Sequence, residues 1–284
     1  MAVFNSWGNK YVRVHIDMAH GVRYTFSEFA VNVRVTKKGA PDLPEAEVTL
    51  HGLGLDMMEQ LTSLTFLKNA RQNNILVIEA GYTEDTIAQI YRGEITKASA
   101  DFNSSPDVNF IIESKSGSYP SIIPQSPISV KGQQPAIEVI QQLASQIGYN
   151  VENNGITTSI SNTYIQGSPI QKIKTIANAI NADLIIDDNT IVVTPRGQPR
   201  RNGITPELSK DNGLIGYPTF TDEGLQVVCF FNPELRIGGM IRIDTIVPKA
   251  KGTWKITEFS HELEVNDSSS ATWRSSFNAV YVGD

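Results

Sequence analysis

Three stretches near the start of the chain alternate apolar and polar residues with a period of two. They are YVRVHID from Tyr11, FAVNVRVT from Phe29 and EAEVTLH from Glu45. This alternation buries one face of a strand and leaves the other in water, which is typical of antiparallel sheets. The same period returns near the end of the chain in GTWKITEFSHELEV and ATWRSSFNAVYVG. The sequence therefore predicts a mainly β protein, and 284 residues allow two or three domains.

The first and last thirds of the chain share an order of strands. In each, a short apolar strand is followed by a long strand, a loop and a second long strand. Residues 75–80, 90–102 and 107–114 correspond in this order to residues 239–247, 252–266 and 270–282. The match is one of order and length, not of residue identity. It predicts two related antiparallel β-barrel domains, residues 1–118 and 205–284, with a helix from Leu55 to Leu67 inside the first.

Between these segments the hydrophobic period changes to that of a helix. QPAIEVIQQLASQIG and SPIQKIKTIANAIN each carry an apolar stripe, and the stripes coincide after a shift of 33 residues. Ser168 is a predicted N-cap, and Pro169 suits the first turn that follows it. A short strand precedes and another follows each helix. Residues 127–196 are therefore predicted to form a small α+β middle domain, a duplicated strand–helix–strand unit with pseudo-two-fold symmetry.

Composition excludes several classes of protein. The net charge of −6 argues against a surface that holds duplex DNA, which needs clustered lysine and arginine. No apolar run is long enough for a membrane-spanning helix, and the N-terminus lacks the apolar core of a signal peptide. The single cysteine, Cys229, rules out an internal disulfide framework. It lies in the apolar run VVCFF, so we interpret it as a small buried side chain in a protein made in a reducing cytosol.

No stretch carries a recognisable catalytic or metal-binding motif. His15 and His20 flank Asp17, but a strand and a turn do not supply three or four convergent ligands. The HELE stretch at His261 lacks the second histidine of the zinc motif. Asp187, Asp188 and Asn189 are not followed by a calcium-binding loop, so they predict a turn. We therefore expect no catalytic residue, no metal and no cofactor.

A polar linker follows the middle domain and contains Arg196, Arg200 and Arg201. Two interpretations remain open for these arginines. The first is a solvated linker, which is the more common role of such a stretch. The second is a surface for an anionic partner.

One long stretch, GLIGYPTFTDEGLQVVCFFNPELRIGGMIRID, runs from Gly213 to Asp244 and marks turns and strand ends. Its features are Gly216, Tyr217 and Pro218, then Asn232 and Pro233, then Gly238 and Gly239. With the strands that follow, it resembles the C-terminal part of the baseplate hub proteins of contractile-tailed bacteriophages. The stretch NNILVIEAGYTEDTIAQIYRGEITKASADF, with Tyr91, Arg92 and Gly93, is similar to the N-terminal tube-like domain of that family.

The resemblance implies a structural role in the phage tail. Hub proteins of this family are trimers that join the hexameric tail tube to the trimeric central spike. Two related β-domains per chain give a ring of six quasi-equivalent domains around the DNA channel. The expected partners are two further copies of the chain, the tube protein, the spike protein, other baseplate proteins and DNA that passes without specific binding. The expected location is the virion baseplate, after assembly in the host cytoplasm and without membrane insertion. The alternative is a tail-associated cell-wall hydrolase or glycan-binding module.

The same long stretch is expected to take part in assembly. LQVVCFF is too apolar for a strand with one wet face, so we predict that both of its faces are covered, either within its own domain or by a neighbouring subunit. Leu225 to Asp244 are predicted to form a strand pair at or near a contact between subunits, with the glycines at positive φ. The expected assembly residues are Tyr217, Pro218, Val228, Asn232, Pro233, Gly238 and Gly239.

Overall fold

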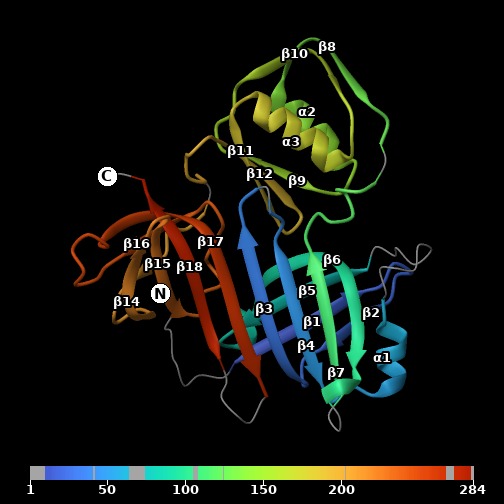
Figure 1. The fold of residues 1–284 in the computed structure, drawn as a ribbon, viewed down its shortest axis with the longest axis vertical. Coiled ribbons are helices and arrows are strands. Elements are labelled where there is room, and N and C mark those ends of the chain that lie inside the picture. The colour runs from blue at the N-terminus through green and yellow to red at the C-terminus, as the bar shows by residue number, and fades with distance from the viewer. Residues whose placement is uncertain are drawn as a thin grey trace.

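The computed structural model describes residues 10–282, except 41, 64–73, 105–107, 124, 202 and 267–271. Thirteen strands form one large sheet below a small α+β unit, which lies beyond one end of β3 and β6 (Figure 1). The strands from the first third are β1 (Tyr11–Asp17), β2 (Arg23–Phe26), β3 (Ala30–Lys38), β4 (Glu45–His51), β5 (Ile75–Gly81), β6 (Ala88–Asp101) and β7 (Asn109–Lys115). Those from the last third are β13 (Glu207–Leu208), β14 (Leu214–Thr221), β15 (Gly224–Phe230), β16 (Met240–Ile243), β17 (Gly252–Val265) and β18 (Trp273–Tyr281). The predicted mainly β fold is confirmed.

The two β-segments do not form separate barrels. The strand order is β14-β15-β18-β17-β3-β4-β7-β6-β5-β1-β2, with β16 paired to β17 and β13 to β16. The second half of β17 pairs with β3, from Glu258 opposite Lys38 to Val265 opposite Val31. Among the described residues no pairing closes either segment on itself. The prediction of two closed barrels is therefore wrong, because a strand edge that a barrel would have closed is used to join the two segments.

The strand order within the two segments is nevertheless the same. One segment runs β3-β4-β7-β6-β5 and the other β14-β15-β18-β17-β16, each in the same chain order. Both long central strands are also irregular at the same point. A register shift lies between Ile95 and Lys97 in β6, and another between Ile256 and Glu258 in β17. The shared strand order predicted for the two segments is confirmed and extends to five strands in each.

The middle of the chain contains the two expected helices. Its elements are β8 (Ile128–Pro135), α2 (Ala136–Ser145), β9 (Asn150–Asn153), β10 (Ser159–Ile165), α3 (Pro169–Ala179), β11 (Ala182–Asp187) and β12 (Thr190–Pro195). β8 pairs with β10, while β9 and β11 flank β12. Ser168 is the N-cap of α3, where its side chain accepts a hydrogen bond from the backbone N–H of Gln171. The strand–helix–strand order occurs twice, and its pseudo-two-fold symmetry stays a prediction.

The helix in the first segment is shorter than predicted. α1 spans Leu55–Leu61 and buries Met58 and Leu61. The Thr62 hydroxyl donates to the carbonyl of Met58, and Ser63 then forms a β-bridge with Ala98. The backbone of Ser63 is thus committed to β6 instead of to another helical turn. The predicted continuation to Leu67 lies outside the described residues.

Three apolar clusters hold the chain together. One belongs to the first segment, one to the middle unit and one to the last segment. The boundaries are not sharp, because Phe231 and Trp273 of the last segment pack in the first cluster. Ile185 and Val192 of the middle unit likewise pack in the third cluster. Adjacent segments therefore share apolar surface.

Candidate functional site

The most extended feature of the molecule is the polar face of the large sheet. Directly paired residues share a face, so one row can be followed across six strands, from β6 to β18. This row consists of Lys97, Glu113, Glu47, Arg34, Glu262 and Arg274. The row crosses the β17–β3 joint without a break, since Arg34 lies opposite Glu262. The two segments thus present one continuous water-facing surface.

This polar face is rich in charge but not cationic. Its carboxylates are Glu45, Glu47, Asp101, Glu113, Glu258, Glu262 and Glu264, and its cations are Arg34, Lys38, Lys97, Lys115 and Arg274. Each of these cations has a carboxylate oxygen within 3.2 Å. The cations are therefore neutralised by their neighbours, and the surplus is one of carboxylates. Such a surface does not hold a polyanion.

The polar face becomes apolar at its β14–β15 end. Val228 and Phe230 continue the face on β15 and are half-buried, while Ile215 on β14 is 38% exposed. On β15 only Leu225, Val227 and Cys229 are fully buried. The second face of LQVVCFF is therefore not covered within the single chain, and its coverage by a neighbouring subunit stays a prediction. Alternate residues point to the core, as in any strand with one open face.

Two of the residues predicted for assembly lie on β14. This strand precedes Leu225 and pairs with β15. Tyr217 is 68% exposed, and Pro218 is buried beside it. Pro218 lies where the register between β14 and β15 shifts, and a strand tolerates proline at such an irregularity because no ladder hydrogen bond is lost. β14 is the end of the sheet path, so its outer edge has no partner strand among the described residues.

The predicted strand pair between Leu225 and Asp244 does not form. β15 pairs with β14 and β18, whereas β16 pairs with β17 and β13. Asn232 instead starts a turn, in which its Oδ1 accepts the backbone N–H of Glu234. Pro233 is half-buried within that turn. The connection leads from β15 to β16, which lie in the same sheet with β18 and β17 between them, so it separates the strands that we expected it to pair.

The two glycines ahead of β16 differ in backbone conformation. Gly238 has a φ of 74°, and a Cβ there would lie 2.6 Å from Cδ1 of Ile185 in the middle unit. Its N–H donates to the carbonyl of Ile256, and its carbonyl accepts the N–H of Arg200. Gly239 has no positive φ, so the expectation of two such glycines holds for Gly238 only. Gly238 therefore serves the contact between the last segment and the middle unit.

His261 lies in the core at the centre of β17. Its Nδ1 is 2.7 Å from Oγ of Ser275, which also accepts the N–H of Asn232 at 3.1 Å. The hydroxyl hydrogen of Ser275 is available to Nδ1 of a neutral ring. Burial, with the nearby charges of Lys37 and Arg236, lowers the pKa of His261 to about 3. The imidazole is thus a core group and not a metal ligand or a catalytic base.

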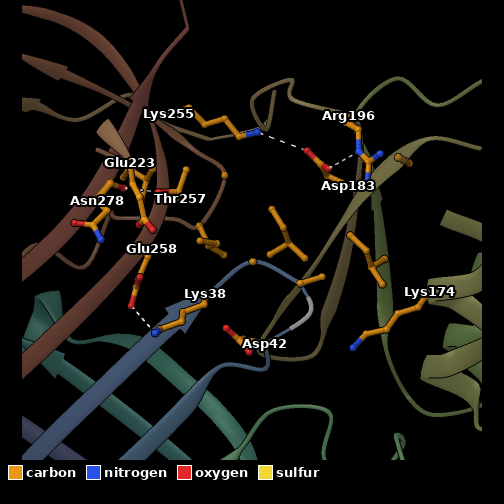
Figure 2. Close-up of a pocket in the computed structure, with 18 of the residues that line it drawn as sticks. Lys38, Asp42, Lys174, Asp183, Arg196, Glu223, Lys255, Thr257, Glu258 and Asn278 are labelled. Carbon is orange, nitrogen blue, oxygen red and sulfur yellow. Dashed lines mark hydrogen bonds and ion pairs between the residues drawn. The ribbon is translucent and has the colours of Figure 1, made fainter. Parts of the chain in front are cut away.

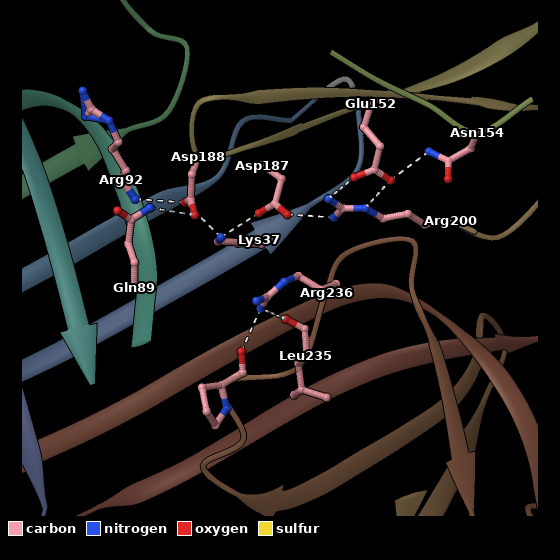
Figure 3. Close-up of polar contacts among 11 residues, drawn as sticks. Lys37, Gln89, Arg92, Glu152, Asn154, Asp187, Asp188, Arg200, Leu235 and Arg236 are labelled. Atoms are coloured by element: carbon pink, nitrogen blue, oxygen red, sulfur yellow. Dashed lines mark hydrogen bonds and ion pairs between the residues drawn. The ribbon is translucent and has the colours of Figure 1, made fainter. Parts of the chain in front are cut away.

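A buried ionic cluster fixes the middle unit to the sheet (Figure 3). Lys37 on β3 reaches Asp187 at 2.7 Å and Asp188 at 2.9 Å, both at the tip of the β11–β12 hairpin. The other oxygen of Asp187 is 2.8 Å from Arg200, which also holds Glu152 on β9 through two hydrogen bonds. Asp187, Asp188 and Asn189 form a turn, as predicted, with Asp188 at a φ of 56°. The turn places both carboxylates against β3.

The cluster also corrects the view of the arginine-rich linker. Arg196 and Arg201 are exposed, but the side chain of Arg200 is only 9% exposed. Burial disfavours the charge of Lys37, yet the two aspartates outweigh it and raise the lysine pKa. Burial likewise opposes ionisation of Asp187, but Lys37 and Arg200 lower its pKa. The cluster therefore stays ionised, and removing one member would leave a buried charge unpaired.

A cleft of about 650 Å³ lies between the middle unit and the last segment (Figure 2). Its charged lining residues are Lys38, Asp42, Lys174, Asp183, Arg196, Glu223, Lys255 and Glu258. Asp183 lies 3.8 Å from both Arg196 and Lys255, and Glu258 lies 2.9 Å from Lys38. These two carboxylates are neutralised by cations, so they do not form the opposed acid pair that a glycoside hydrolase uses.

The remaining candidates for chemistry have structural surroundings. His15 is buried, with Nδ1 2.9 Å from Thr25 and Nε2 3.4 Å from Glu79, while His20 is exposed in a turn. Among the described residues no group of three or more His, Cys, Asp and Glu is placed to hold a metal ion. Cys229 is buried, which raises the pKa of its thiol to about 12. No helix in the described part of the chain is long and apolar enough to cross a membrane.

Comparison with solved structures places this fold among phage tail proteins. A tail protein from Neisseria meningitidis MC58 is similar with a TM-score of 0.66 and 10% identity, over 96% of this chain and 97% of that chain. The 43 kDa tail protein of prophage MuSo2 from Shewanella oneidensis gives 0.63 and 9%, over 95% and 97%. The E. coli c3393 protein, a type VI secretion component, gives 0.59 and 7%, over 95% and 77%.

Sequence comparison identifies the family directly. No curated protein matches the chain. The family model described as baseplate hub gp41, however, matches residues 11–272. This range includes every strand of the large sheet except β18, which begins at Trp273. The chain belongs to the gp41 family of phage baseplate hub proteins.

Proposed function

We propose that three copies of this chain form a ring that joins the hexameric tail tube to the trimeric central spike. The observation that carries this proposal is the repeated strand order, β3-β4-β7-β6-β5 and β14-β15-β18-β17-β16. Two quasi-equivalent units per chain give six in a trimer, so one rim of the ring can match a six-fold partner. The single middle unit of each chain gives only three, which suits a three-fold partner.

The polar face of the sheet lines the channel of this ring. It is an extended face whose residues alternate with the buried ones on each strand of the row, so it can form a channel wall. Its lysines and arginines are already paired with carboxylates, and the surplus is negative. DNA phosphates passing such a wall are repelled and do not bind. DNA is therefore expected to pass through the channel without binding specifically to it.

The partners follow from the family and from the similar structures. The c3393 protein is described as similar to the bacteriophage T4 tail proteins gp27 and gp5. A Francisella PdpA–VgrG complex is similar with a TM-score of 0.60 and 7% identity, over 97% of this chain and 58% of that chain. On this basis we assign the tube protein, the spike protein and neighbouring baseplate proteins as partners. The place of action is the virion baseplate, after assembly in the host cytoplasm.

The role is structural and not enzymatic. The alternative, a cell-wall hydrolase or glycan-binding module, needs an acid pair or a binding groove with free polar groups. The cleft beside the middle unit carries Asp183 and Glu258 in ion pairs. Glu94, whose pKa is raised by burial, lies outside that cleft, where it accepts the N–H of Ser118 and the hydroxyl of Tyr149. No observation favours hydrolysis over a structural role.

Electron microscopy of the purified full-length protein tests the proposal. We expect ring-shaped particles with three-fold symmetry, a central channel and six similar lobes on one rim. The middle units should project from the other rim as three lobes. A peptidoglycan digestion assay on the same preparation should give no product. Particles without a channel, or turnover that a single carboxylate substitution abolishes, would overturn the structural role.

A further inference from the structure

The joint between β17 and β3 occurs once within each chain, but a ring of six units needs such a joint six times. Three joints are internal, and three must form between subunits. The internal joint uses the second half of β17 and the first strand of the other unit. In the repeated order β6 corresponds to β17, and β14 corresponds to β3. We propose, on the basis of the proposed trimer, that β14 of one subunit pairs antiparallel with the second half of β6 of its neighbour.

The residue register of this intersubunit joint can be derived from the repeat. The register shifts make Lys97 equivalent to Glu258. Lys97 pairs with Glu113 on β7, Glu113 pairs with Glu47 on β4, and Glu47 pairs with Arg34 on β3. In the same way, Glu258 pairs with Asn278 on β18, Asn278 pairs with Gln226 on β15, and Gln226 pairs with Thr219 on β14. Arg34 and Thr219 are therefore equivalent. Because Arg34 faces Glu262 in the internal joint, Thr219 should face Asp101 of the neighbour.

This register brings opposite charges together. Lys38 faces Glu258 at the end of the internal joint, and their side chains form an ion pair at 2.9 Å. By the same count Glu223, in the turn that follows β14, lies opposite Lys97 of the neighbour. The signs are reversed, but the pair is again complementary. A cross-strand pair of opposite charge stabilises a sheet, whereas two like charges would destabilise it.

The register also matches side-chain type and size. In the internal joint Thr36 faces Ser260, and their hydroxyl oxygens are 3.4 Å apart. The equivalent pair between subunits is Thr221 and Ser99, again a threonine and a serine. On the other face, Phe220 would lie opposite Ala100. Phe220 is 50% exposed in the single chain, and the small alanine leaves room for its ring.

Among the residues that the structure describes, both edges are open to such a pairing, with one exception. β14 is the last strand of the sheet path. The second half of β6 pairs with β7 on one side, and its other edge carries a bridge from Ser63 to Ala98. Ala98 is equivalent to Phe259, which pairs with Lys37 in the internal joint, so the bridge occupies a position that the arriving chain needs. In the proposed joint the residue opposite Ala98 is Asp222, in the turn after β14, so the Ser63 bridge must open when β14 arrives.

A cysteine cross-link in the full-length protein tests the register. Ser99→Cys combined with Thr221→Cys should give covalent dimers and trimers under mild oxidation, because facing residues in antiparallel strands suit a disulfide. The positive control is Ser260→Cys with Thr36→Cys, which should close a disulfide within one chain. The negative control is Ser99→Cys with Phe220→Cys, whose side chains point to opposite faces. The only natural cysteine, Cys229, is buried and should remain unmodified.

Charge exchange provides a second, independent readout. Lys97→Glu should weaken assembly several-fold, because it places two carboxylates together. Adding Glu223→Lys should restore assembly, which a purely local effect of Lys97 on Glu113 would not allow. A trimer that forms without the cross-link and without this rescue would overturn the proposed joint and leave the hub function standing. A protein that never forms a trimer would overturn both.

Discussion

The buried imidazole of His261 makes a definite prediction about acid stability. Its pKa is about 3 in the folded chain, against an ordinary value of 6.5. Between these two values the unfolded chain binds a proton that the folded chain does not bind. The contribution of His261 to stability is therefore complete above pH 6.5 and is lost as the pH falls toward 3. Replacement of His261 by Phe should remove this part of the pH dependence.

The size of the effect follows from linkage. At pH 5 the unfolded imidazole is almost fully protonated and the folded one is neutral, so the free energy of unfolding falls by about 2 kcal/mol relative to pH 7. The result changes little with the exact folded value, because the folded ring is neutral at pH 5 for any pKa below about 4. His261→Phe should also lower stability at pH 7 by about 1 to 3 kcal/mol, since the buried Ser275 hydroxyl loses its hydrogen-bond partner.

Urea unfolding of the two proteins at pH 7 and pH 5 measures this difference. Other titrating groups are the same in both proteins, so they cancel in the comparison. Protein concentration must be held constant, because assembly adds stability by mass action. Replacement of the exposed His20 by Gln is the matched control and should keep the wild-type difference. If His261→Phe loses as much stability between pH 7 and pH 5 as the wild type does, His261 is not a buried neutral group.

Three further predictions concern packing and the contacts of the middle unit. Lys37→Met should lower the free energy of unfolding by about 3 to 5 kcal/mol, because Asp187 loses a buried partner. The control Lys38→Met, at the surface, should cost less than about 1 kcal/mol. Equal losses of the two variants in chemical denaturation would contradict the buried cluster. Ile173→Ala should cost about 2 to 5 kcal/mol, since Ile173 is fully buried, and a loss below about 0.5 kcal/mol would place that face of α3 in solvent. Val228→Asp should leave the monomer folded by circular dichroism but reduce trimer formation, because Val228 is only half-buried in the single chain; an unfolded monomer would show that Val228 belongs to the core.

The matched control for Val228→Asp needs a different site from the one suggested by the sequence. Ser269, in the stretch NDSSSA, is predicted to lie in a loop that tolerates a charge, but it lies outside the described residues. Thr257 on β17 is a better choice, because its side chain lies at the surface and its hydroxyl bonds only to the carbonyl of Asn278. Thr257→Asp should leave both folding and assembly intact.

Local features of the fold could be predicted from the sequence. Alternation located β1, β3 and β4, and the helical stripes with the Ser168 cap located α2 and α3. These features depend on neighbours within a few residues, which is why a pattern reveals them. β14 escaped this reasoning because Gly216 and Pro218 interrupt its alternation, although residues on both sides still pair with β15.

The long-range contacts could not be predicted from pattern alone. Lys37 and Asp187 are 150 residues apart, and Arg200 and Glu152 are 48 apart. An arginine in a polar linker is expected to be exposed to solvent, and only the fold shows that Arg200 is buried. The β17–β3 joint likewise depends on which strand edges remain free after both segments have folded. Closed barrels and one joined sheet have the same strand patterns, so the sequence did not distinguish them.

The mass of the purified protein in solution tests the central claim most directly. Light scattering coupled to size-exclusion chromatography, at several protein concentrations and with or without the spike protein, gives this mass. The hub function predicts an assembly of three chains of 31.2 kDa each, with the spike present if the chain alone is too dilute to assemble. A chain that remains monomeric, or that forms only dimers, at every concentration and with the spike present contradicts the ring of six quasi-equivalent units.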